Sequence, residues 1–463
     1  MNVPLNEHIF RAYDVRGNAE RDLSPALATS IGRAIGTLVR RAGHSPRVAI
    51  GRDARLSGPG LCTALAQGLG EVGCIAVDIG IVATPLLYFA VHTSEVGGGV
   101  MVTGSHNPPQ DNGFKMMIGD ETVHGETIQR LKTMILEEDF DLVAAHDRGK
   151  PEEHDIRTPY EAYIRHDVEM GPRPLHVVID AGNGPTGPIV PGLLRSLGCR
   201  VEELYCELDG LFPNHHPDPT VAENLVDLQR EVLARGADLG IAYDGDGDRI
   251  GVVDEHARII WGDRLLVLLS SALLAVEPGA TIVAEVKCSQ HLFDDIEAHG
   301  GRAIMSRVGH SLIKSRMRQE QALLAGEMSG HVFYKHRYFG FDDAIYTTCR
   351  LLEILSQDDR PLSEHLVDLP QSHATPELRL DCPDAIKFSV VERVTADYRQ
   401  SHEVIDIDGV RVLFENGWGL VRASNTGPIL VLRCEADDAA TCEDIHRQLL
   451  ERIDAAREAL SRD

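Results

Sequence analysis

The sequence has no paired-cysteine motif. Its nine cysteines are scattered along the chain, without a CxxC pair and without the Cys/His spacing of a zinc site. This pattern predicts neither a structural zinc nor a disulfide framework, and it is typical of proteins that fold in a reducing compartment. We therefore expect a cytoplasmic protein.

Long hydrophobic runs are also missing. The richest apolar run is LLVLLSSALLAV at 265–276, and it is too short to cross a bilayer, which takes about 20 apolar residues. Near the N-terminus, charged residues come before any apolar stretch of signal-peptide length. We expect no membrane association, and a buried helix over this run.

The sequence lacks an excess of positive charge as well. Lysine and arginine number 45 against 71 aspartate and glutamate residues, which gives a formal net charge of -26. Such a charge opposes binding to nucleic acid or to an anionic membrane, so neither is expected as a partner. A small phosphorylated metabolite can still bind where a few cations line one cleft.

Short apolar runs alternate with longer helical stretches through most of the chain. With 463 residues, the chain exceeds the size of one hydrophobic core and predicts several domains. Strand-like runs open three sections, at RVAIG (47–51), HVVID (176–180) and TIVAEV (281–286). A later strand in each section ends in a glycine-bearing loop. This alternation predicts three similar α/β domains with mainly parallel mixed sheets, whose loops could meet around one cleft.

The last hundred residues have a different pattern of apolar residues from the three preceding sections. Hairpin-like strands and an amphipathic closing helix predict a smaller α+β domain there. Turn-rich stretches then divide the chain into four predicted domains around a central cleft: 1–150, 151–256, 257–368 and 369–463.

The segment TGSHNP at 103–108 places a serine directly after an apolar strand. Ser105 stands between Gly104 and His106, and small neighbours allow a substrate to approach a hydroxyl that carries a phosphoryl group. The alternative is an ordinary Ser/Asn turn, and these six residues alone do not separate the two interpretations.

The segment DGDGD at 244–248 places three carboxylates at alternate positions. In an extended backbone Asp244, Asp246 and Asp248 share one side, where hard oxygen ligands suit Mg²⁺ or Ca²⁺. Without a cation their mutual repulsion would be costly. The spacing also fits an EF-hand loop, but Arg249 occupies the position of the required glycine and the flanks look like strands, so Mg²⁺ is favoured.

A third segment, GNGPTG at 182–187, matches the GxGxxG pattern of dinucleotide-binding loops. Pro185 and Pro188 crowd this turn. A structural turn between strand and helix is therefore the favoured interpretation, with cofactor binding as the alternative.

Two further loops offer polar groups for a ligand. GEMSGH at 326–331 holds Glu327 and Ser329, a pair suited to two vicinal sugar hydroxyls. RASNTGP at 422–428 presents several N–H and O–H donors on a turn, as a phosphate site would. Its candidate residues are Arg422, Ser424, Asn425 and Thr426. Taken singly, each loop can equally be a plain turn.

The four loops TGSHNP, DGDGDR, GEMSGH and RASNTGP occur in the order and spacing of the α-D-phosphohexomutase family, which the chain resembles over nearly its whole length. RAYDVRG, NGFK and FPNHHPDP add further matches. The resemblance implies four domains around a deep cleft and a phosphoserine at Ser105. It also implies Mg²⁺ held by Asp244, Asp246 and Asp248 together with a phosphate oxygen on Ser105.

The same resemblance implies roles for other residues. Those expected to act on the transferring group are Ser105, His106, Lys115, Arg249, His310 and Arg16. Those expected to bind the substrate are Tyr13, Lys287, His310, Glu327, Ser329, His331, Arg422, Ser424, Asn425 and Thr426. One departure is Gly427, which stands where a second threonine is expected and predicts the loss of one phosphate contact.

The implied activity is that of an intramolecular phosphotransferase. It would interconvert the 1- and 6-phosphates of mannose or glucose through glucose 1,6-bisphosphate or mannose 1,6-bisphosphate, which also serves as activator. We expect a monomer that acts on small hexose phosphates. A phosphoglucosamine mutase and a metal-dependent sugar phosphatase stay open as alternatives.

Overall fold

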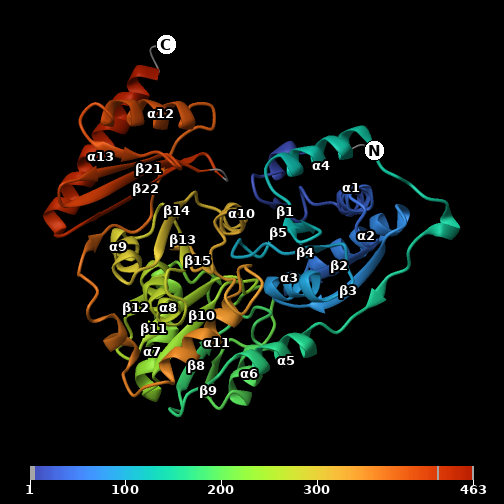
Figure 1. Ribbon diagram of the computed structural model, residues 1–463. Coiled ribbons are helices and arrows are strands. Elements are labelled where there is room, and N and C mark those ends of the chain that lie inside the picture. The colour runs from blue at the N-terminus through green and yellow to red at the C-terminus, as the bar shows by residue number, and fades with distance from the viewer. Residues whose placement is uncertain (1–5, 425–426, 461–463) are drawn as a thin grey trace.

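The computed structural model describes residues 6–424 and 427–460. Within them the chain folds into four sheets that follow one another along the sequence (Figure 1). The first three sheets mix parallel and antiparallel strands, and the fourth is antiparallel throughout.

The first sheet has the order β1-β5-β4-β2-β3-β7, with β6 paired to β5. Its strands are β1 (Val15–Asn18), β2 (Arg47–Arg52), β3 (Ile75–Ile81), β4 (Gly98–Val102), β5 (Asp111–Ile118), β6 (Glu121–Thr122) and β7 (Glu152–Glu153). The helices of this part are α1 (Pro25–Arg41), α2 (Gly58–Glu71), α3 (Thr84–Thr93) and α4 (Glu126–Glu137).

The second sheet has the order β12-β11-β10-β8-β9. Its strands are β8 (His176–Asp180), β9 (Arg200–Leu204), β10 (Leu239–Tyr243), β11 (Ile250–Asp254) and β12 (Ile259–Ile260). The helices of this part are α5 (Arg157–Asp167), α6 (Val190–Ser196) and α7 (Val226–Arg235).

The third sheet has the order β14-β13-β15-β16. Its strands are β13 (Thr281–Glu285), β14 (Arg302–Ser306), β15 (Leu324–Gly326) and β16 (Val332–Tyr334). The helices of this part are α8 (Gly262–Val276), α9 (Gln290–Ala298), α10 (His310–Glu320) and α11 (Ala344–Leu355).

The fourth sheet has the order β17-β22-β21-β20-β19, with β18 paired to β22. Its strands are β17 (His373–Ala374), β18 (Leu378–Asp381), β19 (Glu403–Ile405), β20 (Val410–Phe414), β21 (Gly417–Ala423) and β22 (Ile429–Ala436). Two helices, α12 (Lys387–Tyr398) and α13 (Ala439–Leu460), accompany it. The predicted fold class, three α/β domains and a smaller α+β domain, is confirmed.

The first three sheets share one local arrangement. In each, a strand that is parallel to one neighbour runs directly into an antiparallel partner: β4 into β5, β10 into β11 and β15 into β16. The connecting loops contain TGSHNP, DGDGDR and EMSGH. Each loop therefore leaves the carboxyl end of a parallel strand, which is where open α/β sheets bind ligands.

The first three domains also share one hydrophobic core. Leu87 of α3, Tyr160 of α5 and Leu266 of α8 belong to the same continuous cluster of buried side chains. The fourth domain has its own core and meets the third through a small cluster that includes Val286 and Trp418. The relative placement of the first three loops is thus fixed by a large apolar contact.

The apolar run at 265–276 lies inside α8, where all six of its leucines are buried. The buried helix predicted there is confirmed. Among the described residues, no helix combines the length and the apolar character needed to cross a membrane.

Helices α1 and α2 pack closely because each of them has a glycine that faces the backbone of the other helix. A Cβ atom on Gly32 would lie 2.3 Å from the carbonyl oxygen of Leu65, and one on Gly68 would lie 2.0 Å from that of Thr29. No side chain fits at either position without moving a helix.

Replacing Gly68 by alanine should therefore destabilise the protein. We expect Gly68→Ala to lower the free energy of unfolding by about 1 to 3 kcal/mol, the usual cost of overpacking, measured as a lower urea midpoint. Gly60→Ala is the matched control, since Gly60 lies in the same helix with open space around it. Alanine favours helix there by up to about 1 kcal/mol, so equal midpoints for the two variants would contradict the close packing.

Candidate active site

Asp244, Asp246 and Asp248 lie in the loop between β10 and β11, and all three are completely buried. One carboxylate oxygen of each lies within 4.8 Å of the others. Asp244 Oδ1 closes the turn by accepting from the backbone N–H groups of Asp248 and Arg249 at 3.0 and 3.1 Å. Burial and the two neighbouring carboxylates raise the pKa of Asp244 well above its ordinary value, as expected where like charges are crowded.

Lys115 on β5 brings positive charge to this acidic triad. Its ammonium group donates to Asp246 Oδ2 at 2.7 Å and also contacts Asp248. Thr84, at the start of α3, donates to the same Asp246 oxygen at 2.6 Å. The other oxygen, Asp246 Oδ1, is buried without a hydrogen-bond partner among the described residues. An unsatisfied buried oxygen is costly, and a group of hard oxygen ligands suits a divalent cation such as Mg²⁺.

The alternatives drawn from the sequence fit less well. Strands β10 and β11 flank the acidic loop, where an EF-hand requires helices. The GNGPTG loop packs against the acidic loop, because a Cβ atom on Gly184 would lie 3.4 Å from the carbonyl oxygen of Gly245. In a dinucleotide loop this second glycine faces the pyrophosphate, so a structural turn is the better interpretation.

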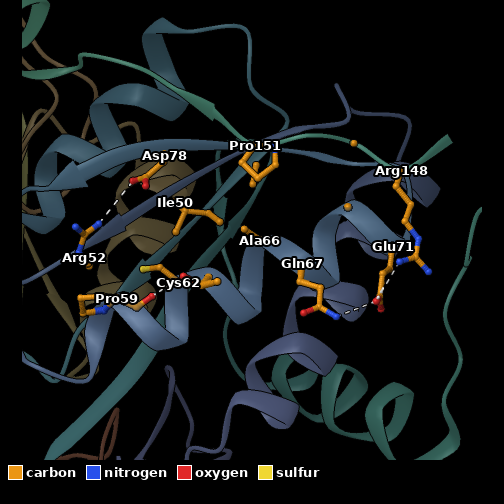
Figure 2. Close-up of a pocket in the computed structure, with 14 residues that line it drawn as sticks. Ile50, Arg52, Pro59, Cys62, Ala66, Gln67, Glu71, Asp78, Arg148 and Pro151 are labelled. Carbon is orange, nitrogen blue, oxygen red and sulfur yellow. Dashed lines mark hydrogen bonds and ion pairs between the residues drawn. The ribbon is translucent and has the colours of Figure 1, made fainter. Parts of the chain in front are cut away.

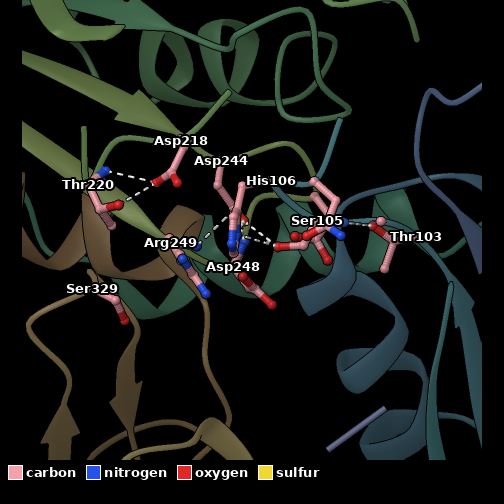
Figure 3. Close-up of polar contacts among 12 residues, drawn as sticks. Thr103, Ser105, His106, Asp218, Thr220, Asp244, Asp248, Arg249 and Ser329 are labelled. Carbon is pink, nitrogen blue, oxygen red and sulfur yellow. Dashed lines mark hydrogen bonds and ion pairs between the residues drawn. The ribbon is translucent and has the colours of Figure 1, made fainter. Parts of the chain in front are cut away.

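Ser105 follows β4 in a backbone conformation that residues other than glycine seldom adopt. Its φ is 49°, and the residue is 2% exposed. The hydroxyl donates to Asp244 Oδ2 at 2.8 Å and lies 3.2 Å from His106 Nδ1. Figure 3 shows Ser105 and His106 beside Asp244 and Arg249. This turn of the first domain holds its hydroxyl against the triad of the second.

Arg55 supports the serine loop, and the sequence analysis did not identify it. Its buried guanidinium group donates to the carbonyl oxygens of Ser105 and Asn107 at 2.7 and 2.6 Å. Asp53 holds Arg55 through an ion pair of 3.0 Å. The available signal was GRDAR at 51–55, which puts an acid and a base two residues apart at the end of an apolar strand.

Arg16 and His106 join the same loop. Arg16 on β1 donates to Asn107 Oδ1 at 3.0 Å and pairs with Asp14 at 2.6 Å. Burial, reinforced by the charges of Arg249 and Arg16, lowers the pKa of His106 well below its ordinary value. The His106 ring next to the serine hydroxyl is therefore neutral.

His331 joins the sugar-binding loop predicted in the third domain to the triad. Its Nδ1 lies 2.5 Å from Glu327 Oε2 and its Nε2 lies 3.1 Å from Asp248 Oδ1. Arg249 and His331 also pair through their backbones as an isolated β-bridge. Burial and the charge of Arg249, whose Nε lies 3.3 Å from His331 Nε2, oppose the charged ring, but the two carboxylates outweigh them and raise the pKa of His331 to about 9. Ser329 lies at the edge of this group, 3.5 Å from Glu327.

Tyr13 and His310 connect the first and third domains. The Tyr13 hydroxyl donates to the carbonyl oxygen of Val308 at 2.9 Å, and its ring meets the His310 ring edge-on at 6.2 Å. The His310 ring in turn lies 5.8 Å from that of His331. These residues therefore belong to the same cluster as Ser105 and the triad.

Lys287 and Arg422 form a second group toward the fourth domain. Lys287 Nζ donates to Glu377 Oε2 at 2.9 Å and lies 3.4 Å from Glu285 Oε1. Arg422 Nε donates to Asp408 Oδ2 at 3.1 Å. Both cations are thus bonded to carboxylates other than those of the triad.

The predicted phosphate loop is described only at its two ends. Lys387 on α12 donates to the carbonyl oxygens of Ser424 and Gly427 at 2.6 and 3.0 Å, and the N–H of Gly427 donates to Ser424 Oγ at 3.2 Å. Asn425 and Thr426 lie outside the described residues, so their roles stay predictions.

Two surface hollows lie apart from the acidic triad. One, of about 490 Å³, lies on the first domain and is lined by Arg52, Asp78, Arg148, Gly149 and Pro151 among others (Figure 2); it contains none of the predicted site residues. The other, of about 500 Å³, lies between the N-terminal segment and the fourth domain, and Lys387 and Gly427 are among its lining residues. The second hollow therefore borders the predicted phosphate loop.

Matches to known proteins extend over nearly the whole chain. The sequence matches four family models, described as phosphoglucomutase/phosphomannomutase alpha/beta/alpha domains I, II and III and the C-terminal domain, over residues 7–142, 159–258, 261–373 and 377–452. It is 49% identical over 457 residues to a phosphomannomutase/phosphoglucomutase of Pseudomonas aeruginosa, covering 98% of this chain and 97% of that one. It is 48% identical over 447 residues to a phosphoglucomutase of Neisseria gonorrhoeae, covering 96% of each.

A solved structure shows the same likeness. The crystal structure of a phosphoglucomutase/phosphomannomutase family protein from Burkholderia thailandensis matches with a TM-score of 0.92, at 42% identity and over 98% of both chains.

From the two carboxylates beside His331 we predict the pH at which its ring titrates in the metal-free protein. We expect the imidazole to titrate near pH 9 in nitrogen-15 NMR spectra. Since this value lies above the roughly 6.5 of an unfolded histidine, the charge adds stability below about pH 6.5 and the gain is lost as the pH rises through 9. Glu327→Gln should lower the pKa by about one unit or more.

His310 serves as the internal control, because burial lowers its pKa well below the ordinary value. A His331 ring that is neutral at pH 7 would contradict the paired-carboxylate environment.

Proposed function

The chain belongs to the phosphoglucomutase/phosphomannomutase family, and we propose that it interconverts hexose 1-phosphates and hexose 6-phosphates through a phosphoryl group carried on Ser105. The protein is thus an enzyme, an intramolecular phosphotransferase. The observation that carries the proposal is the 2.8 Å contact between Ser105 Oγ and Asp244 Oδ2. This contact joins the buried hydroxyl of the first domain to the acidic cation site of the second domain. Neither loop alone would bring the two groups together.

Mg²⁺ is the metal that the triad fits best. Its ligands would be Asp244, Asp246 and Asp248, together with a phosphate oxygen on Ser105. Support comes from the unpartnered Asp246 Oδ1 and from the preference of this ion for a few carboxylates plus phosphate oxygens. When bound, the ion would offset the negative charge of the transferring phosphoryl group.

In the proposed reaction, a hydroxyl of the bound sugar phosphate attacks the phosphorus on Ser105. Arg249 and Lys115, which flank the triad, would stabilise negative charge on the transferring group, and such fixed charges are usually the largest contribution in phosphoryl transfer. The product is glucose 1,6-bisphosphate or mannose 1,6-bisphosphate. This intermediate must turn around before its other phosphate returns to Ser105, and it would also act as activator.

The remaining loops would hold the sugar in either orientation. Glu327 and Ser329 offer acceptors and a donor for sugar hydroxyls, and their loop is anchored to the triad through His331. The further substrate contacts are expected from Tyr13, Lys287, His310, His331, Arg422, Ser424, Asn425 and Thr426. Gly427 lacks the hydroxyl of a threonine, and its N–H already donates to Ser424 Oγ at 3.2 Å, so one phosphate contact fewer is expected from this position.

Two competing activities are separated by one assay series. A phosphoglucosamine mutase would prefer glucosamine 1-phosphate over mannose 1-phosphate and glucose 1-phosphate when each is given with a trace of bisphosphate. A sugar phosphatase would release inorganic phosphate continuously from all of them. The monomeric state and the cytoplasmic location remain predictions from the sequence.

Replacing Ser105 tests the phosphoryl carrier. We expect Ser105→Ala to lower kcat at least about a thousandfold, as removal of a nucleophile does, and to abolish the phosphoserine that intact-protein mass spectrometry detects in the active enzyme. Ser401→Ala is the control, because Ser401 is exposed and its hydroxyl bonds the neighbouring His402. Mutase activity of the Ser105 variant equal to that of the unchanged protein would refute the carrier role.

Removing the metal tests the triad. Excess EDTA should abolish transfer, and added Mg²⁺ should restore it. Asp246→Asn should lower kcat by about two orders of magnitude or more, because a charged ligand is lost. Asp254→Asn provides a matched change, since Asp254 is equally buried but its carboxylate binds Arg258 instead of facing the triad. Full activity in EDTA would rule out the metal role.

A further inference from the structure

Two buried polar atoms face each other without a partner at the edge of the site. His310 Nδ1 and Asp342 Oδ2 are 3.6 Å apart, and neither has a hydrogen-bond partner within the described residues. Asp342 is completely buried and His310 is 8% exposed. Leaving a buried donor and a buried acceptor unpaired costs about 1 to 3 kcal/mol for each, so a small shift that joins them is favourable.

The carboxylate of Asp342 is held from the opposite side. Lys314, one turn after His310 on α10, donates to Asp342 Oδ1 at 2.9 Å. The Lys314 ammonium group also lies over the Tyr88 ring, 4.2 Å from its centre. An ammonium group has only donors. It therefore occupies one carboxylate oxygen and leaves Oδ2 as an acceptor for the His310 ring.

The surroundings of His310 leave its other nitrogen available. Tyr13 and His331 border the ring, and in the described part of the chain no residue forms a hydrogen bond with Nε2. Burial and the charges of Lys314 and Lys115 lower the pKa of His310 well below its ordinary value. The ring is therefore neutral, and which nitrogen carries its proton depends on the partner of Nδ1.

We propose that Asp342 is a positioning residue that accepts the N–H of His310 Nδ1 and thereby directs the lone pair of Nε2 toward the sugar hydroxyl that attacks phosphorus. This inference rests on the proposed function of the site. A base whose second nitrogen is oriented by a carboxylate is a general way to fix both the tautomer and the direction of an imidazole.

The proton follows a closed path in this scheme. The hydroxyl oxygen bonds to phosphorus while the bond between phosphorus and Ser105 Oγ breaks; the hydroxyl proton passes to Nε2 and from there to Ser105 Oγ, which regains the hydroxyl that donates to Asp244. In the second half-reaction Ser105 Oγ takes the other phosphoryl group and gives up its proton, which passes through Nε2 to the sugar oxygen that is released. Asp342 stays ionised and stabilises the imidazolium during each transfer.

A metal ion is a weaker explanation of Asp342. Its carboxylate lies within 4.8 Å of ligand atoms of Asp248 and His331. However, Lys314 already binds Asp342 and Lys115 already binds Asp248. A second divalent cation would meet these ammonium groups at short range and be repelled.

Asp342→Asn tests the proposal without changing the shape of the side chain. The amide oxygen should turn to Lys314, so that the amide N–H₂ faces His310 Nδ1 and stabilises the wrong tautomer. We expect kcat to fall about a hundredfold, in the range of general-base catalysis, with less than about threefold change in KM because ground-state contacts are retained. In a His310→Gln background the same substitution should change kcat by less than about twofold.

Asp343→Asn is the matched control. The adjacent carboxylate is 1% exposed and accepts from the hydroxyls of Tyr160 and Tyr338 at 2.9 and 2.8 Å. Its replacement affects packing rather than His310, so its effect on kcat should be the same in both backgrounds. An Asp342→Asn effect that persists in the His310→Gln background would overturn the proposal, as would unchanged kcat.

Nitrogen-15 NMR decides the tautomer independently of turnover, with the His310 signals identified by their loss in His310→Gln. The unchanged protein should show His310 protonated at Nδ1, and Asp342→Asn should shift the population to the form protonated at Nε2. An Nε2–H ring in the unchanged protein overturns the positioning role. Absence of mutase activity in the unchanged protein would instead refute the proposed function.

Discussion

The organising constraint of this protein is the burial of three carboxylates in one loop. Asp244, Asp246 and Asp248 lose their hydration together, and like charges at this separation repel strongly in a low-dielectric interior. Positively charged groups from other parts of the chain offset this repulsion. Lys115 comes from the first domain and the charged ring of His331 from the third. The positive charge that offsets the repulsion at the triad thus comes from two other domains.

The same strand–loop–strand arrangement occurs in each of the first three domains and brings a loop to the site. Each of the first three domains ends a parallel strand in a loop before an antiparallel strand, and a shared apolar core fixes the three sheets against one another. The loops then differ in chemistry: a hydroxyl, a set of carboxylates, and a carboxylate–imidazole pair. The fourth domain, with its own core and a small contact to the third, carries the remaining predicted phosphate loop.

Two histidines in the cluster differ in charge because their neighbouring groups differ. His331 has a carboxylate at each ring nitrogen, which outweighs burial and raises its pKa to about 9. His310 has Lys314 nearby and a carboxylate at only one side, and burial lowers its pKa. When their environments push the pKa values of two similar groups apart, one group stays protonated and can donate a proton, while the other stays deprotonated and can accept one. The site therefore has a charged imidazole that ties its loops together and a neutral imidazole beside it.

The sequence by itself determined the element types and the positions of the four loops, because hydrophobic periodicity and turn residues are local properties. The chemistry expected of each loop rested on the family resemblance, since a loop taken singly could equally be a plain turn. Only the tertiary structure decided which groups meet. The contact of Ser105 with Asp244 spans 139 positions, and nothing near either residue encodes it. Arg55, Thr84 and Asp342 went unnoticed because a single buried arginine, threonine or aspartate has no pattern of its own. Their roles follow from burial and from partners distant in the chain, which set the charge and the hydrogen bonding of every group in the site.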